Sequence, residues 1–120
     1  MRGMPLVNIY TSAAPPAPGA ADALLKSVSS SVATLIGKPE RYVMTCLVPQ
    51  TRMTFAGTLA PACYVEVKSI GKMSPELTQR LSADLCQKLA SGLGVQSSRT
   101  YIEFSDAQGY LWGHDGSTFG

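Results

Sequence analysis

The fold is decided by residues 63–105, which read CYVEVKSIGKMSPELTQRLSADLCQKLASGLGVQSSRTYIEFS. The first part, Cys63–Ile70, is rich in residues that favour extended backbone. Val65 and Val67 alternate there with larger or polar neighbours, and this alternation is typical of a strand with one buried face. We therefore predict a β-strand over Cys63–Ile70.

A helix and a second strand follow. Ser74 is a good N-cap, Pro75 suits the first helical position, and Glu76 adds an acid to the first turn. The apolar stripe of this helix consists of leucines at four-residue steps: Leu77, Leu81, Leu85, Leu89 and Leu93. Two glycines end it, and residues 100–105 are again rich in β-formers. The order strand, helix, strand is a βαβ unit.

The first half of the chain repeats this order. Leu6–Thr11 is a β-rich run, and residues 13–21, rich in Ala and Pro, are expected to form a loop. Apolar residues then recur at helical spacing: Leu24, Leu25, Val28, Val32, Leu35 and Ile36. Gly37 ends this helix, and residues 42–48 form the next β-rich run. The chain thus carries two copies of one unit.

Two βαβ repeats predict an α+β fold with a four-stranded mixed sheet. Right-handed crossovers place both helices on one face of that sheet. We expect the other face to carry Val, Ile, Tyr and Cys side chains, so it has to be covered as well. Neighbouring subunits are the natural cover, because no chain remains to supply one. The domain is expected to span residues 5–120, preceded by an extension of residues 1–4.

Composition narrows the function classes. Charged residues make up 15% of the chain and the net charge is +2, with no basic block, so we expect neither nucleic acid nor a membrane as a partner. No apolar run approaches the roughly 20 residues of a membrane span or forms a signal peptide. We expect a cytoplasmic protein, with any export occurring without a signal peptide.

The cysteines point away from disulfide and metal chemistry. The chain has three, Cys46, Cys63 and Cys86, an odd number at wide spacing. That pattern matches neither a disulfide framework nor a zinc site. No CxxC motif surrounds Cys63, so redox chemistry of that type is not expected. We expect no metal and no cofactor.

Short motifs along the chain carry a family resemblance. They are Met4-Pro5-Leu6-Val7, GKPERYVM at residues 37–44, MTFAG at 53–57, SIGK at 69–72, RTYI at 99–102 and GSTFG at 116–120. Together they resemble the macrophage migration inhibitory factor family of the tautomerase superfamily. The resemblance implies a homotrimer with active sites between subunits. It also implies keto–enol tautomerisation of 2-oxo acids such as phenylpyruvate.

The resemblance also assigns roles to particular residues. Pro5, freed at the N-terminus by removal of methionine, would be the general base. Lys38 and the backbone N–H of Ile70 would bind the substrate carboxylate, and Tyr101 would reach the pocket of the next subunit. Tyr42 and Phe119 would form an aromatic wall. Further candidate pocket residues are Leu6, Glu103, Trp112 and His114.

A free N-terminal proline makes chemical sense as the base. An α-amine titrates at about 7.7–8.0, and burial in an apolar pocket lowers that value toward neutrality. A proline within the chain has an amide nitrogen and no basicity. If residues 1–4 stay attached, the alternative is a trimer that is catalytically silent.

The sequence departs from the family pattern at two candidate positions. Glu103 stands where relatives often have an amide, and a carboxylate there would repel an anionic substrate. His114 takes the place of an aromatic residue and is either a stacking ring or a second acid or base.

A cytokine-like, receptor-binding protein is the alternative from another class. The family's receptor-contacting arginine in the first loop has no counterpart, because residues 13–21 contain no basic residue. We therefore do not expect receptor binding.

Overall fold

The computed structural model describes residues 5–120; the predicted extension, residues 1–4, lies outside the described residues. The main elements are β1 (Leu6–Thr11), α1 (Pro18–Ile36), β2 (Met44–Val48), β3 (Cys63–Ile70), α2 (Pro75–Leu93) and β4 (Thr100–Ala107). Short elements are the 3₁₀ turns η1 (Glu40–Tyr42), η2 (Ser97–Arg99) and η3 (Gly109–Leu111), and the strands β5 (Gly113–His114) and β6 (Ser117–Thr118).

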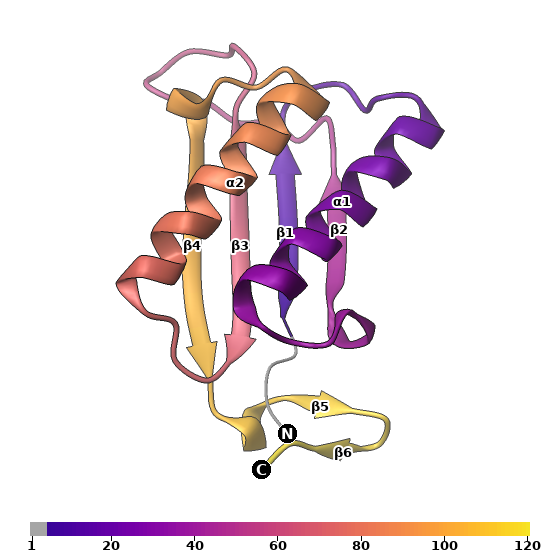
Figure 1. Ribbon diagram of the computed structural model, residues 1–120. Helices are drawn as coiled ribbons and strands as arrows, with labels where there is room; N and C mark the ends of the chain where they lie inside the picture. The colour runs from indigo at the N-terminus through magenta and orange to yellow at the C-terminus, as the bar shows by residue number, and fades with distance from the viewer. Residues whose placement is uncertain (1–4) are drawn as a thin grey trace.

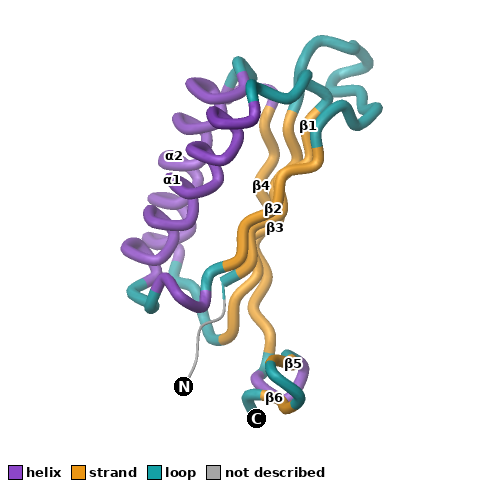
Figure 2. The backbone as a smooth tube through the Cα atoms, turned by 90° about the vertical axis from the view of Figure 1, so that its right-hand side faces the viewer, coloured by secondary structure: helices purple, strands orange, loops and turns teal. Residues whose placement is uncertain are grey.

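The sheet confirms the prediction of two βαβ repeats. Its strand order is β2-β1-β3-β4. The outer pairs β1–β2 and β3–β4 are parallel, and the central pair β1–β3 is antiparallel. Both helices lie on one face of the sheet, as Figures 1 and 2 show from two directions. The β5–β6 hairpin lies beyond one end of the sheet (Figure 1).

The core lies between the helices and the sheet. Val7 and Ile9 of β1 are fully buried there, as are Leu81, Leu85 and Leu89 of α2. Burying one such side chain stabilises the fold by about 1.5–3 kcal/mol. The leucines predicted as one stripe thus form the α2 half of the core.

Three element boundaries differ from the prediction, and one of them is the end of β4, which runs to Ala107 and not to residue 105. The segment 13–21 is only partly a loop, because α1 already begins at Pro18. Proline suits the first turn of a helix, where its missing N–H has no partner to lose. The strand expected over residues 42–48 begins at Met44, since Glu40–Tyr42 form the 3₁₀ turn η1.

The sheet face opposite the helices is more polar than predicted. Val65, Val67 and Ile9 turn toward the helices, so the prediction that such residues line the open face was wrong for them. Strand alternation and register give the open face the side chains Leu6, Asn8, Tyr10, Met44, Cys46, Val48, Tyr64, Glu66, Lys68, Tyr101 and Glu103.

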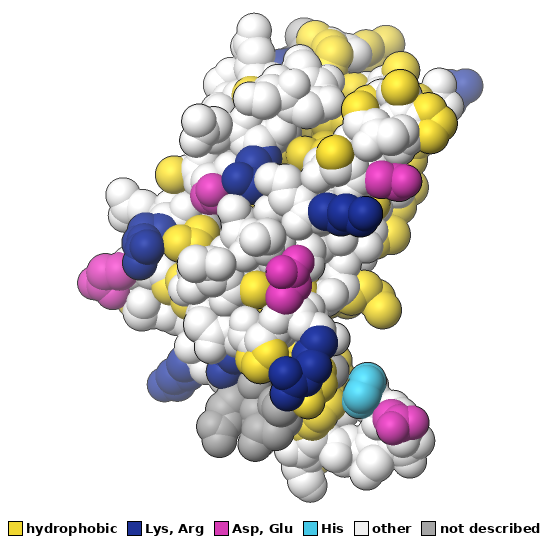
Figure 3. Space-filling view, turned by 45° about the vertical axis from the view of Figure 1, so that its right-hand side comes forward, with side chains coloured by type: hydrophobic (Ala, Val, Ile, Leu, Met, Phe, Trp, Pro, Cys, Tyr) yellow, Lys and Arg dark blue, Asp and Glu magenta, His cyan; other side chains and the backbone are white. Residues whose placement is uncertain are grey.

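This open face is bare in the described part of the chain (Figure 2). Met44 and Tyr101 keep 65% and 67% of their surface exposed. Figure 3 shows hydrophobic side chains gathered along the edge on which the sheet lies, whereas charges of both signs are scattered over the rest of that view. A bare face with large apolar residues is typical of a surface that another molecule covers.

Candidate active site

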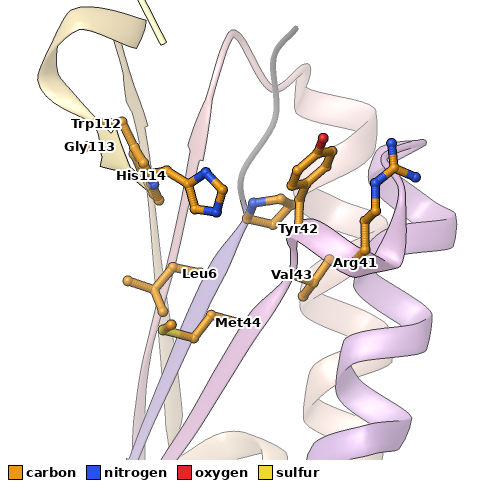
Figure 4. Close-up of a pocket in the computed structure, with 9 residues that line it drawn as sticks. Leu6, Arg41, Tyr42, Val43, Met44, Trp112, Gly113 and His114 are labelled. Carbon is orange, nitrogen blue, oxygen red and sulfur yellow. The ribbon is translucent and has the colours of Figure 1, made fainter. Parts of the chain in front are cut away.

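Three distant segments meet at one end of the sheet. Because β1 and β2 are parallel, both begin there; β4 runs antiparallel to β1 and so ends there. The residue before β1, the turn before β2 and the hairpin after β4 therefore come together. They enclose a cavity of about 360 Å³, a volume within the range of small-molecule sites. Its lining residues are Pro5, Leu6, Arg41, Tyr42, Val43, Met44, Trp112, Gly113 and His114 (Figure 4).

Pro5 is held firmly at the edge of this cavity. Its side chain is less than 2% exposed, and its carbonyl accepts a hydrogen bond from the Met44 N–H at 3.0 Å. That bond continues the β1–β2 ladder by one residue. The backbone at Pro5 is thus fixed by the sheet, while the ring borders the cavity.

A stack of rings closes one wall of the cavity. The guanidinium of Arg41 lies 4.7 Å from the centre of the Tyr42 ring. Tyr42 meets His114 edge-on at 6.4 Å, and His114 stacks on Phe119 at 5.7 Å with 19° between the rings. The contact between Tyr42 and His114 joins η1 to the C-terminal hairpin. Aromatic pairs of this kind are worth about 0.5–1.5 kcal/mol beyond burial. The two pairs fix the position of the His114 ring.

The hairpin that carries His114 depends on a tight turn. Asp115 and Gly116 both have positive φ, 53° and 79°, as the two central residues of a type I′ turn require. The hairpin is anchored at Gly109, whose carbonyl accepts from the Phe119 N–H at 3.1 Å. A Cβ atom at Gly109 would lie 2.5 Å from the Phe119 oxygen, so the close approach requires glycine.

The structure brings together part of the predicted site. Pro5, Leu6, Tyr42, Trp112 and His114 line the cavity. Phe119 adjoins it through its stack on His114.

Lys38 and Ile70 lie near this end of the sheet without lining the cavity. Lys38 follows Gly37, the left-handed C-cap of α1, and its N–H donates to Ala33 O at 3.0 Å. Ile70 is the last residue of β3, and Gly71 turns the chain away after it with φ 96°.

Tyr101 lies near the other end of the sheet. It pairs with Tyr64, which pairs with Tyr10, so it is level with the end of β1 and not with its beginning. Five residues of strand separate Pro5 from Tyr10, about 17 Å at the usual rise. The side chain of Tyr101 contacts Phe55, with the ring centres 5.0 Å apart. Tyr101 therefore cannot reach the cavity of its own chain.

Glu103 belongs to a polar network on the open sheet face. The Tyr64 hydroxyl is 2.6 Å from the Glu103 carboxylate and 3.1 Å from that of Glu66, to which Asn8 donates at 3.2 Å. The hydrogen bond to Glu103 raises the pKa of the Tyr64 phenol. The Asn8 amide holds the pKa of Glu66 below its usual value. In its own chain, Glu103 thus faces Tyr64 and not the cavity.

Residues 4–120 match the model of the macrophage migration inhibitory factor (MIF) family. The match covers the sheet, both helices and the hairpin. The chain belongs to the macrophage migration inhibitory factor family. This family is part of the tautomerase superfamily, as the resemblance in the sequence indicated.

Individual members of the MIF family agree with this assignment. A MIF homologue of Trichuris trichiura is 41% identical over 79% of this chain and 83% of its own length. One from Brugia malayi is 35% identical over 98% of this chain and 100% of its own length. The crystal structure of the MIF homologue from Prochlorococcus marinus is 47% identical and has a TM-score of 0.90, covering 96% of this chain and 99% of that one.

Sequence reasoning missed four residues of the cavity. Arg41, Val43, Met44 and Gly113 line it beside the predicted ones. The sequence did contain a signal for Gly113. Asp115-Gly116 favours a two-residue hairpin turn, and that hairpin would have placed Gly113 beside His114. Arg41 lies in η1, Val43 follows it, and Met44 begins β2, so only the parallel pairing of β2 with β1 brings these three to Pro5.

Neither helix within residues 5–120 is both long and apolar enough to cross a membrane. In the same range, no three His, Cys, Asp or Glu side chains are grouped so that they could hold a metal ion.

Proposed function

We propose that this chain is a keto–enol tautomerase for phenylpyruvate-like 2-oxo acids, with Pro5 as general base when it is the first residue. The observation that carries the proposal is the burial of Pro5 at the edge of a ligand-sized cavity with aromatic and apolar walls. The MIF family, which includes phenylpyruvate tautomerases, supports the reaction class.

The proposed reaction moves one proton between carbon and oxygen. In the enolisation direction, the neutral amine of Pro5 takes a proton from the carbon next to the ketone. The electron pair of that C–H bond forms the C=C bond, the electrons of the C=O π bond move to oxygen, and the protonated amine then gives its proton to this oxygen and is neutral again. An apolar site keeps an amine neutral near pH 7 because burial disfavours its charged form. The walls formed by Leu6, Tyr42 and Met44 provide such surroundings.

The substrate carboxylate is proposed to lie on Lys38 and the backbone N–H of Ile70. Both residues are near the end of the sheet at which Pro5 lies. A 2-oxo acid carries its carboxylate on the ketone carbon, so holding the acid also positions the adjacent C–H bond at the base.

A direct assay tests the function. Phenylpyruvate is supplied as its enol, and the loss of enol absorbance is followed with a chain that begins at Pro5. We expect first-order decay that is faster in proportion to protein concentration. A rate equal to that of buffer alone would refute the proposed function.

We expect the chain to be a homotrimer, as members of the family typically are. The bare sheet face supports this, as does Tyr101, which can contribute to a pocket only in a neighbouring copy. Sedimentation equilibrium should give about three times the chain mass of 12.7 kDa. A monomer that persists at micromolar concentration would contradict a site shared between subunits.

Substituting Cys63 should leave tautomerisation intact. The thiol is 2% exposed, and burial raises its pKa, so the reactive thiolate is disfavoured. Serine replaces the sulfur by a smaller oxygen and keeps a side-chain group that can donate a hydrogen bond. We expect Cys63→Ser to show an unchanged rate per folded trimer. Lost activity with an unchanged circular dichroism spectrum would contradict this.

A further inference from the structure

The charge of the cavity depends on one histidine. The ionisable side chains that line it are Arg41, Tyr42 and His114, and no Asp or Glu is among its lining residues. The Arg41 guanidinium is engaged on the face of the Tyr42 ring, at 4.7 Å from its centre. In Figure 4, Tyr42 lies between Arg41 and His114. His114 is therefore the lining side chain of the type that changes charge near neutral pH, beside the amine of a free Pro5.

The imidazole is fixed in place and free to bind. Phe119 stacks on the imidazole and Tyr42 contacts it edge-on, so packing sets the orientation of the His114 ring. Among the described residues, no group makes a hydrogen bond to either ring nitrogen. The side chain is exposed, so the nitrogens lie within reach of a ligand in the cavity.

We propose that His114, in its protonated form, is a second carboxylate-binding group, for aromatic organic acids that lie in this cavity away from Lys38 and Ile70, and that it makes ligand selection depend on pH. The inference rests on the proposed function for the class of ligand. Apolar and aromatic walls accommodate the ring, and the imidazolium N–H donates to the carboxylate. Charged hydrogen bonds of this kind are about twice as strong as neutral ones.

Other charged groups near His114 also contribute to the electrostatic potential at the imidazole. Arg41 and Glu40 belong to η1, and Asp115 follows His114 in its own hairpin. A free amine at Pro5 would also titrate. Arg, Asp and Glu side chains ordinarily titrate outside the range of pH 5.5 to 8, whereas His side chains and α-amines ordinarily titrate within it or at its edge. A variant of His114 separates its contribution from that of a free Pro5 amine.

The test uses the fact that the chain has one histidine. Its C–H resonances can be followed by NMR as pH is varied, with no assignment step. The probe is 3-phenylpropanoate, and 3-phenylpropanamide is the neutral match. We expect saturating 3-phenylpropanoate to move the imidazole titration to higher pH, because a bound anion favours the imidazolium, and the amide to leave it unchanged.

The affinity for 3-phenylpropanoate should therefore depend on pH as well. If bound 3-phenylpropanoate raises the pH midpoint of the imidazole titration by one unit, 3-phenylpropanoate binds about tenfold more tightly at a pH below both midpoints than at a pH above both. His114→Phe keeps the stack on Phe119 and loses the charge. In that variant, we expect the ratio of the affinities for 3-phenylpropanoate at pH 5.5 and at pH 8 to be about tenfold smaller than in the parent. Any pH dependence that is left would come from Pro5.

Two results would overturn the proposal. One is an imidazole titration that 3-phenylpropanoate leaves unchanged, whether the acid binds elsewhere or not at all. The other is a His114→Phe variant with the pH dependence of the parent. Neither measurement needs turnover. A chain that shows the moved titration but no tautomerisation would refute the proposed function and keep this inference.

Discussion

A chain that begins at Pro5 should tautomerise phenylpyruvate about 10²–10⁴-fold faster than one that retains residues 1–4, the contribution typical of a positioned proton-transfer group. In the longer chain the Pro5 nitrogen is part of an amide, and its lone pair is delocalised into the peptide bond. The measurement compares both lengths at matched protein concentration, with intact mass confirming each N-terminus.

Pro5→Gly in the short chain is the matched control. It keeps an α-amine at the same place but makes it primary and removes the ring that borders the cavity. We expect partial activity from this variant. Equal rates for the two chain lengths would show that Pro5 is not the base, and attention would then turn to His114 as the acid or base.

Lys38→Ala should raise KM for phenylpyruvate tenfold or more, with a much smaller change in kcat. A hydrogen bond from a charged donor is worth about 1.5–3 kcal/mol, which corresponds to roughly 10–150-fold in binding. The fold should survive, because the lysine is half-buried in a surface loop and its backbone N–H, bonded to Ala33, is retained.

Lys26→Ala is the control for loss of charge. Lys26 is an exposed residue of α1 and lies outside the cavity. Its substitution should change neither KM nor thermal stability. If KM stays the same in Lys38→Ala as well, Lys38 does not bind the carboxylate.

The sequence predicted those elements whose signals are local. β1 and β3 have the predicted bounds, and buried and less buried residues alternate along all of β1 and along β3 as far as Ser69. The start of α2 was visible in Ser74, whose Oγ indeed accepts the Leu77 N–H at 3.1 Å. α1 has no such side-chain cap at Ala17, and its first turn therefore read as loop. The two-residue strands of the hairpin are too short for any periodicity.

The candidate site was predictable only where the family motifs mark single residues. Tyr42, Trp112 and His114 stand in or near such motifs and line the cavity. Arg41 and Met44 adjoin them in sequence, but their place in the cavity depends on how β2 pairs with β1. The position of Tyr101 at the other end of the sheet depends on strand register, which is not encoded in a local pattern.

Trp112 is placed so that its fluorescence emission reports on the cavity. It is the chain's one tryptophan, and it lines the cavity beside the hairpin. A ligand that displaces water from the cavity should move the indole emission to shorter wavelength. If the hairpin detached while α1 and α2 stayed packed, the emission would move to longer wavelength with no loss of helical circular dichroism. Fluorescence therefore distinguishes local opening at this end of the sheet from unfolding of the whole domain.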